Sequence, residues 1–269
     1  MSGGDESENL SFSVTFFDGY SFRNMVEYIR SGNKVGYFIF SKTLITYIEQ
    51  DNTGIVLNKI TIKTDELVEY VCNSETPIYV GLNFDELRSF TKPIKKKDSI
   101  KLYKIKNKPT VYIEVLSGSN SHRTENVASI RISNIEKNVV YTLPESTNSK
   151  ASCVISSTNF SLMCSGMSTI KSGFVEITNY SKGMKFKACV GTGLSERLTT
   201  FGIINEEDRV SESDLQISML TIKYLSKLPT LCNTGTMKLY TNLVGCLLIR
   251  SHIGTFGEID VYIKLKEKK

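Results

Sequence analysis

The sequence has few of the residues from which metal and disulfide sites are built. In 269 residues it holds two histidines and six cysteines, and the cysteines are scattered without a C-x-x-C pair. A zinc site needs clustered Cys and His ligands, and a disulfide framework needs closely placed cysteines in an oxidising compartment. We therefore expect reduced, structural cysteines, no metal and no cofactor.

Catalytic motifs are also missing. His122 and His252 stand in polar, loop-like contexts, and neither belongs to an H-E-x-x-H pair. The segment Gly191–Gly193 (GTG) follows a strand-like run, but no helical pattern opens after it, so it does not predict a phosphate-binding loop. No G-x-S-x-G motif and no P-loop occurs. The sequence predicts a protein that is not an enzyme.

Long apolar runs are absent as well. No run approaches the roughly 20 apolar residues that a membrane-spanning helix needs. The first ten residues, MSGGDESENL, are acidic and polar, unlike a secretory signal, and this favours an intracellular protein. The net charge of +5 is only mildly basic, so the position of the charge matters more than its sum.

Strand-like runs dominate the first half. They are rich in β-branched and aromatic residues, and several alternate apolar with polar residues, as half-buried antiparallel strands do. The predicted strands cover residues 12–17, 34–40, 44–49, 55–63, 100–106 and 110–116.

Two short amphipathic patterns interrupt these strands. Residues 21–30 place four apolar side chains at helical spacing, and residues 84–91 follow Asn83, a favoured helix N-cap. Pro93 then closes the second pattern. We expect one helix at each place.

The second half repeats this plan. Helices are predicted at 159–170 and 220–228, the latter ended by Pro229, and they lie about as far apart as the first two. The surrounding strands are predicted at 152–156, 174–179, 184–190, 215–219, 237–240, 243–250 and 258–264. The fold class is therefore α+β, with two similar domains of antiparallel sheet and two short helices in each. The expected boundaries are 1–133, a connector at 134–150, and 151–269.

Basic residues gather on the outward faces of the predicted helices. Such a layer suits sequence-independent contact with a phosphate backbone, although Lys and Arg also decorate ordinary solvated helices. The candidate DNA-binding residues are Arg23, Arg30, Arg88, Lys92, Lys171, Lys223 and Lys227.

Three segments carry a resemblance to a known family. Residues 48–62 combine two strands with a turn that contains Asp51 and Thr53, residues 141–145 read YTLPE, and residues 257–266 read GEIDVYIKLK. In this order they resemble the turn, the interdomain connector and the last strand of a sliding clamp of the proliferating cell nuclear antigen (PCNA) type. The resemblance extends from about residue 12 to residue 266.

Several positions depart from that family pattern. Gln50 and Gly54 replace larger residues, Gly245 stands where a proline is common, and Lys264 with Leu265 replaces a small residue and a proline. The C-terminal KLKEKK is basic where many members are acidic. We expect a groove with a different shape and partner preference, in a protein from a virus or a distant eukaryote.

The resemblance implies a DNA polymerase processivity factor. It would form a ring of three subunits around duplex DNA, with helices lining the hole and with edge strands 127–133 and 197–202 pairing between subunits. Partners would be polymerases, a clamp loader and other replication or repair proteins, in the nucleus, or at a cytoplasmic replication site if the protein is viral. Their groove would be lined by Ile55, Leu57, Tyr141, Leu143, Pro144 and Tyr262.

Three other readings remain open from the sequence. Two belong to the same class: a subunit of a heteromeric checkpoint clamp, and a viral processivity factor that stays monomeric. The third is a β-rich structural protein, in which the basic helical faces would have no DNA partner.

Overall fold

A computed structural model describes residues 9–117, 124–133, 141, 143, 150–191, 195–210, 215–232, 234–243 and 245–267. Contacts within the chain divide it into two units. Unit 1 comprises Met1–Glu49, Lys59–Val140 and Ile253–Glu258, and unit 2 comprises Gln50–Asn58, Tyr141–His252 and Ile259–Lys269. The boundary between the units therefore passes through two strands, β4 (Val56–Lys63) and β17 (Gly257–Lys264).

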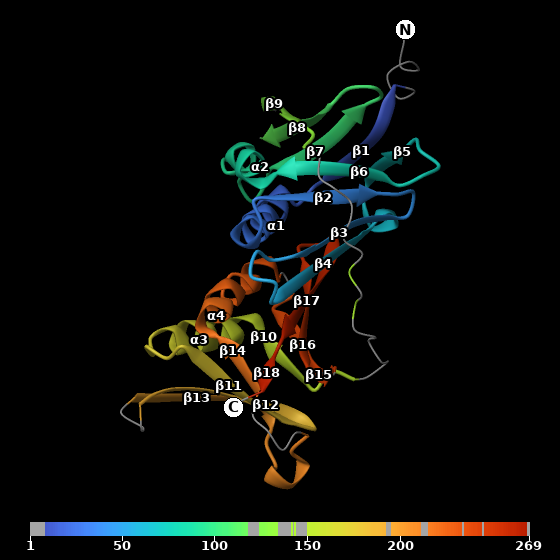
Figure 1. The fold of residues 1–269 in the computed structure, drawn as a ribbon. Helices are drawn as coiled ribbons and strands as arrows, with labels where there is room; N and C mark the ends of the chain where they lie inside the picture. Colours follow the sequence, from blue (N-terminus) through green and yellow to red (C-terminus); the bar gives the residue numbers. More distant parts are fainter. Residues whose placement is uncertain are drawn as a thin grey trace. The chain divides into compact units, whose positions relative to one another are not determined.

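Unit 1 contains a five-stranded antiparallel sheet in the order β5-β1-β7-β8-β9 (Figure 1). Its strands are β1 (Leu10–Phe16), β5 (Glu69–Cys72), β7 (Ser99–Ile105), β8 (Thr110–Ser117) and β9 (Thr124–Arg131). A second run of strands has the order β6-β2-β3-β4. It adds β2 (Val35–Phe40), β3 (Leu44–Gln50) and β6 (Ile78–Asn83), and the 3-10 turn η1 (Thr64–Glu66) follows β4.

The two strand runs of unit 1 enclose an aromatic core. Phe12 of β1 and Phe40 of β2 are fully buried and stack with ring centroids 3.9 Å apart and an interplanar angle of 14°. Phe40 sits at an inward position of β2, along which burial alternates, whereas β1 is buried on both faces from Phe12 to Phe16. The alternation read from the sequence therefore places Phe40 in this core, and the apolar residues of β1 meet it there.

Helices α1 (Gly19–Gly32) and α2 (Phe84–Thr91) lie side by side in unit 1. The side chain of Asn83 accepts hydrogen bonds from the backbone N–H groups of Asp85 and Glu86, so α2 begins at its predicted residue. Helix α1 begins earlier than predicted because Asp18 is its N-cap and accepts from Ser21 N at 2.9 Å.

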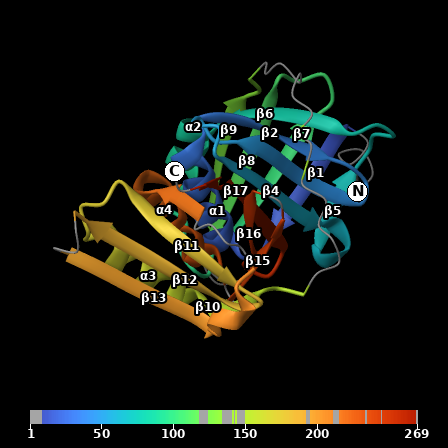
Figure 2. The same cartoon turned by 60° about the horizontal axis from the view of Figure 1, so that its bottom comes forward.

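Unit 2 contains the five-stranded antiparallel sheet β13-β12-β11-β14-β18 and the strand run β10-β15-β16-β17. Figure 2 shows β11, β12 and β13 side by side. The strands are β10 (Cys153–Ser156), β11 (Phe174–Tyr180), β12 (Lys182–Val190), β13 (Ser195–Ile203), β14 (Leu215–Ser218), β15 (Thr236–Leu243), β16 (Cys246–Ile253) and β18 (Lys266–Glu267), with the 3-10 turn η2 (Glu206–Asp208) before β14.

The helices of unit 2 are α3 (Ser157–Ser168) and α4 (Met219–Leu225). Helix α4 is shorter than the predicted 220–228 and is followed by the 3-10 turn η3 (Leu228–Leu231). Pro229 has no N–H to donate to the carbonyl of Leu225, so α-helical hydrogen bonding does not continue through it. No helix in the described residues is long and apolar enough to cross a bilayer.

The two units repeat one topology. The order β1-β7-β8-β9 of unit 1 corresponds to β10-β15-β16-β17 of unit 2, and β6-β2-β3-β4 corresponds to β14-β11-β12-β13. In both units the first helix follows the first strand, and the second helix precedes the last three strands of the repeat. The predicted α+β class, with two similar halves of antiparallel sheet and two short helices each, is confirmed.

Candidate functional site

An apolar cluster gathers on one sheet face of unit 2. Cys246, Leu248 and Tyr262 are buried at its base, with exposed fractions of 8%, 1% and 5%. Three partly buried apolar residues pack against this base, namely Leu57, Leu143 and Tyr240. Leu57 lies on β4 and Tyr240 on β15, and Leu143 precedes β10, so residues far apart in the sequence meet here.

Strand register brings the base of this cluster together. Tyr240 lies opposite Leu248 in the β15–β16 pair. Arg250 of β16 contacts Asp260 of β17 through two hydrogen bonds. Because the strands are antiparallel, Leu248, two residues before Arg250, lies beside Tyr262, two residues after Asp260. Side chains two residues apart on a strand share a face, so these side chains lie in one row.

Leu57 is held in place by the turn before β4. Asp51 Oδ1 accepts from the backbone N–H groups of Ile55 and Val56, both at 3.0 Å, and Asp51 Oδ2 accepts from Thr53 Oγ1 at 2.7 Å. Gly54 adopts a φ of 70°, which an L side chain rarely adopts, and this supplies the chain reversal. The turn resembling the clamp family is therefore present, with Asp51 and Thr53 in it.

The structure places only some of the six predicted groove residues in this cluster. The structure brings together Leu57, Leu143 and Tyr262. Ile55 and Tyr141 are partly buried but do not belong to the cluster, and Pro144 lies outside the described residues. Sequence reasoning missed Cys246, Leu248 and Tyr240. The alternation of predicted strands 237–240 and 243–250 could have placed them on one face, but their pairing depends on register.

The base of the cluster carries no charge at neutral pH. Burial raises the pKa of the Tyr262 hydroxyl to about 12, and the nearby Asp260 carboxylate adds to this increase. Burial likewise raises the pKa of the Cys246 thiol to about 11. A protonated phenol beside a protonated thiol gives a surface suited to apolar and aromatic side chains of a partner.

A fixed ion pair borders the cluster. Arg250 donates to Asp260 through Nε at 2.6 Å and Nη2 at 2.9 Å, and its guanidinium carbon lies 5.6 Å from the centre of the Tyr240 ring. The carboxylate side chain is only 12% exposed, whereas that of Arg250 is 36% exposed. The two-pronged contact fixes the guanidinium, and the guanidinium in turn covers the Tyr240 ring.

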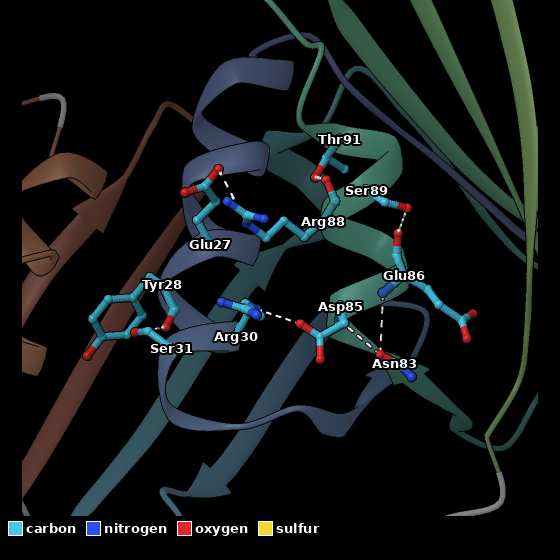
Figure 3. A network of polar contacts seen from close by, with 10 residues as sticks. All are labelled: Glu27, Tyr28, Arg30, Ser31, Asn83, Asp85, Glu86, Arg88, Ser89 and Thr91. Atoms are coloured by element: carbon cyan, nitrogen blue, oxygen red, sulfur yellow. Dashed lines mark hydrogen bonds and ion pairs between the residues drawn. The ribbon is translucent and has the colours of Figure 1, made fainter.

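The helical cations of unit 1 are held by neighbouring acids (Figure 3). Arg30 Nε donates to Asp85 Oδ1 at 2.6 Å, and Glu27 lies 3.8 Å from both Arg23 and Arg88. Helix α1 has two arginines and one glutamate, and α2 has one arginine and two acids, so the pair of helices is neutral. The positive charge of these arginines is therefore partly neutralised by neighbouring acids, more than the sequence pattern indicated.

The predicted lysines lie in different surroundings. Lys92, Lys171, Lys223 and Lys227 are exposed, and the structure shows no ion pair for any of them with another described residue. Only Lys223 lies inside a helix, because Lys92 caps α2 and the other two lie beyond the ends of α3 and α4. Cations at helix C-termini are favoured by the helix dipole, so the basic charge lies at the ends of the helices.

Metal binding has no support in the described part of the chain. No group of three or more His, Cys, Asp or Glu side chains there is arranged to hold a metal ion. The arrangement that does exist is an apolar surface with a charged border, which suits binding of a protein segment.

The fold is that of a PCNA-type DNA clamp. The crystal structure of proliferating cellular nuclear antigen from Entamoeba histolytica matches the chain with a TM-score of 0.77 and 18% sequence identity. The match covers 96% of this chain and 99% of the amoebal chain. No protein-family model matches the sequence, and no curated protein sequence does so.

Proposed function

We propose that the protein is a DNA sliding clamp that encircles duplex DNA and tethers replication proteins to it. The observation that carries this proposal is the repeated two-unit fold, which is shared along almost the whole chain with a PCNA. A clamp works by topology and needs no catalytic group, in keeping with a protein that is not an enzyme.

Two strand edges support assembly into a ring. Strand β9 is the last strand of its sheet and pairs only with β8 among the described strands, and β13 likewise pairs only with β12. Val127 on β9 and Leu198 on β13 are 61% and 48% exposed. An exposed edge with apolar side chains invites pairing with another chain.

The repeat indicates how these edges would pair. In the shared topology β9 is the counterpart of β17, and β13 is the counterpart of β4. Within one chain, Lys264 at the end of β17 donates its N–H to the carbonyl of Ile55, just before β4, at 3.0 Å. Pairing of β9 with β13 of a second copy would repeat that contact, and three copies would close a ring.

DNA would be held by phosphate contacts without base readout. The exposed lysines Lys92, Lys171, Lys223 and Lys227 are the better placed of the predicted residues, since Arg23, Arg30 and Arg88 already face acids. Contacts of this kind weaken with salt and allow movement along the duplex. The cluster around Tyr262 would bind a short helical turn of a polymerase or another replication protein.

Native mass spectrometry with paired proline variants tests the ring. Along an edge strand, the backbone N–H groups of successive residues point alternately to the paired strand and to the open edge. One of Thr199 and Thr200 therefore directs its N–H to β12, and the other directs it to the open edge. Proline removes one N–H. The wild type should have three times the subunit mass of 30.2 kDa. One proline variant should be a folded monomer, and the other should be destabilised.

Other masses discriminate between the remaining readings. A mass of one subunit at all concentrations would contradict the ring and favour a monomeric processivity factor. A ring that forms only with other chains would identify a heteromeric clamp subunit. A trimer that neither proline variant disrupts would overturn the assignment of β13 to the interface.

A further inference from the structure

The apolar cluster around Tyr262 has a lysine at each of two ends. On β15, Lys238 stands two residues before Tyr240, and on β17, Lys264 stands two residues after Tyr262. Side chains two residues apart share a sheet face, so both lysines lie on the face that carries the cluster. Lys238 lies opposite Arg250, which contacts Asp260, so these three residues form one row across β15, β16 and β17. Tyr240 and Tyr262 lie in the next row, and Lys264 lies two residues beyond Tyr262. The two lysines therefore flank the cluster from opposite ends.

Both lysines keep their charge exposed. Lys238 and Lys264 are solvent-exposed, and neither forms an ion pair that the structure shows with another described residue. Among the described residues of this face, Asp260 is occupied by the two hydrogen bonds from Arg250 and is largely buried, and Glu258 lies two residues further from Tyr262 along β17. The stretch of this face between Lys238 and Lys264 is therefore apolar in the middle and has a lysine at each end.

We propose that the protein segment which docks on this cluster carries acidic residues on both sides of its apolar anchors. This rests on the proposed function, because it specifies the partner of the same binding site. Carboxylates at the two flanks would meet Lys238 at one end and Lys264 at the other. A segment with basic flanks would place like charges together, and such juxtaposition selects against wrong partners.

The strand geometry sets the spacing of the two acidic flanks. Lys238 and Lys264 are separated by two strand spacings of about 4.8 Å and by four residues of about 3.3 Å each, which places their Cα atoms about 16 Å apart. An extended segment covers this distance in about five residues, and a helical one covers it in about eleven.

Three synthetic peptides test this preference on the full-length protein. Each has the same central helical turn with two aliphatic and two aromatic side chains, flanked on both sides by three Glu, three Gln or three Lys residues. Fluorescence anisotropy at low and at physiological ionic strength measures their affinity. We expect the Glu-flanked peptide to bind most tightly and the Lys-flanked peptide most weakly. Their dissociation constants should differ by about tenfold, and this difference should shrink as salt is added.

Charge reversal provides the control. In the double variant Lys238→Glu with Lys264→Glu the order should invert, whereas Lys182→Glu, an exposed position on β12, should leave the order unchanged. If all three peptides bind equally well to both proteins, the docking site stands and the acidic preference is overturned. If no peptide binds at all, the site itself is overturned together with the preference.

Discussion

Arg250 on β16 and Asp260 on β17 form a two-pronged ion pair that borders the apolar cluster of unit 2, with N–O distances of 2.6 and 2.9 Å. The pair has two consequences for the site. It neutralises Asp260, and it fixes the guanidinium over the Tyr240 ring. The ion pair thus fixes the border of the cluster beside Tyr240.

Breaking that ion pair should measurably destabilise the fold. Asp260→Asn is expected to lower the free energy of unfolding by about 1–2 kcal/mol, because a hydrogen-bonded carboxylate is removed and a mostly covered guanidinium is left without it. Urea denaturation measures the change. Lys238→Gln, an exposed lysine on the same face, should change stability by less than about 0.5 kcal/mol. Equal effects of the two variants would contradict the structural role of the pair.

Two glycines with nearly the same backbone conformation allow strain to be separated from crowding. Gly202 and Gly235 have φ angles of 76° and 71°, but a Cβ at Gly202 would collide with the carbonyl oxygen of Lys182, whereas nothing lies within 4 Å at Gly235. Gly235→Ala should cost about 1 kcal/mol for the conformation alone. Gly202→Ala should cost about 3 kcal/mol, since overpacking is added. Thermal unfolding of both variants checks the difference, and equal losses would refute it.

Tyr262 makes a defined contribution to alkaline instability. Its folded-state pKa of about 12 lies above the ordinary value of 10, so the unfolded chain loses this proton at lower pH than the folded chain does. The folded state then binds more protons, and stability falls as pH rises from about 10 to about 12. Denaturation across this range should show a smaller decline in Tyr262→Phe than in the wild type. An identical decline would show that Tyr262 is not the source.

The exposed lysines and the paired arginines should contribute unequally to DNA binding. Lys92→Glu with Lys223→Glu should weaken retention on duplex DNA and reduce the steepness of its salt dependence by about 0.9 for each phosphate that is no longer neutralised. Arg30→Gln with Asp85→Asn, which removes a pair without changing net charge, should have a smaller effect. The binding constant measured over a range of salt concentrations separates the two. A larger effect in the paired variant would reverse the assignment.

Local pattern was sufficient for much of the fold. Alternation gave the core strands, Asn83 marked the start of α2, and the repeat of two helices per half gave the duplication. Strand β5 was missed because it has only four residues and no buried position, and β6 was missed although it contains three buried residues.

The site was harder to predict because it depends on tertiary structure. Leu57 and Tyr262 were found through the family resemblance, but Leu248 and Cys246 enter the cluster only through strand register. In the same way, Glu27 and Arg88 are far apart in the sequence, and only the packing of α1 beside α2 brings them within 3.8 Å. Ion pairs between helices are set by packing, so the net charge of the helical face could not be read from counts.

Trapping on linear DNA tests most directly whether the protein encircles the duplex, and it needs no loader. The protein is allowed to thread onto a linear duplex, both ends are then blocked with a bulky protein, and retention is followed at a salt concentration that abolishes simple phosphate contacts. We predict that the protein stays on the blocked duplex and leaves after a restriction cut opens a new end. Retention that is the same with open ends, with blocked ends and after cutting would contradict encirclement.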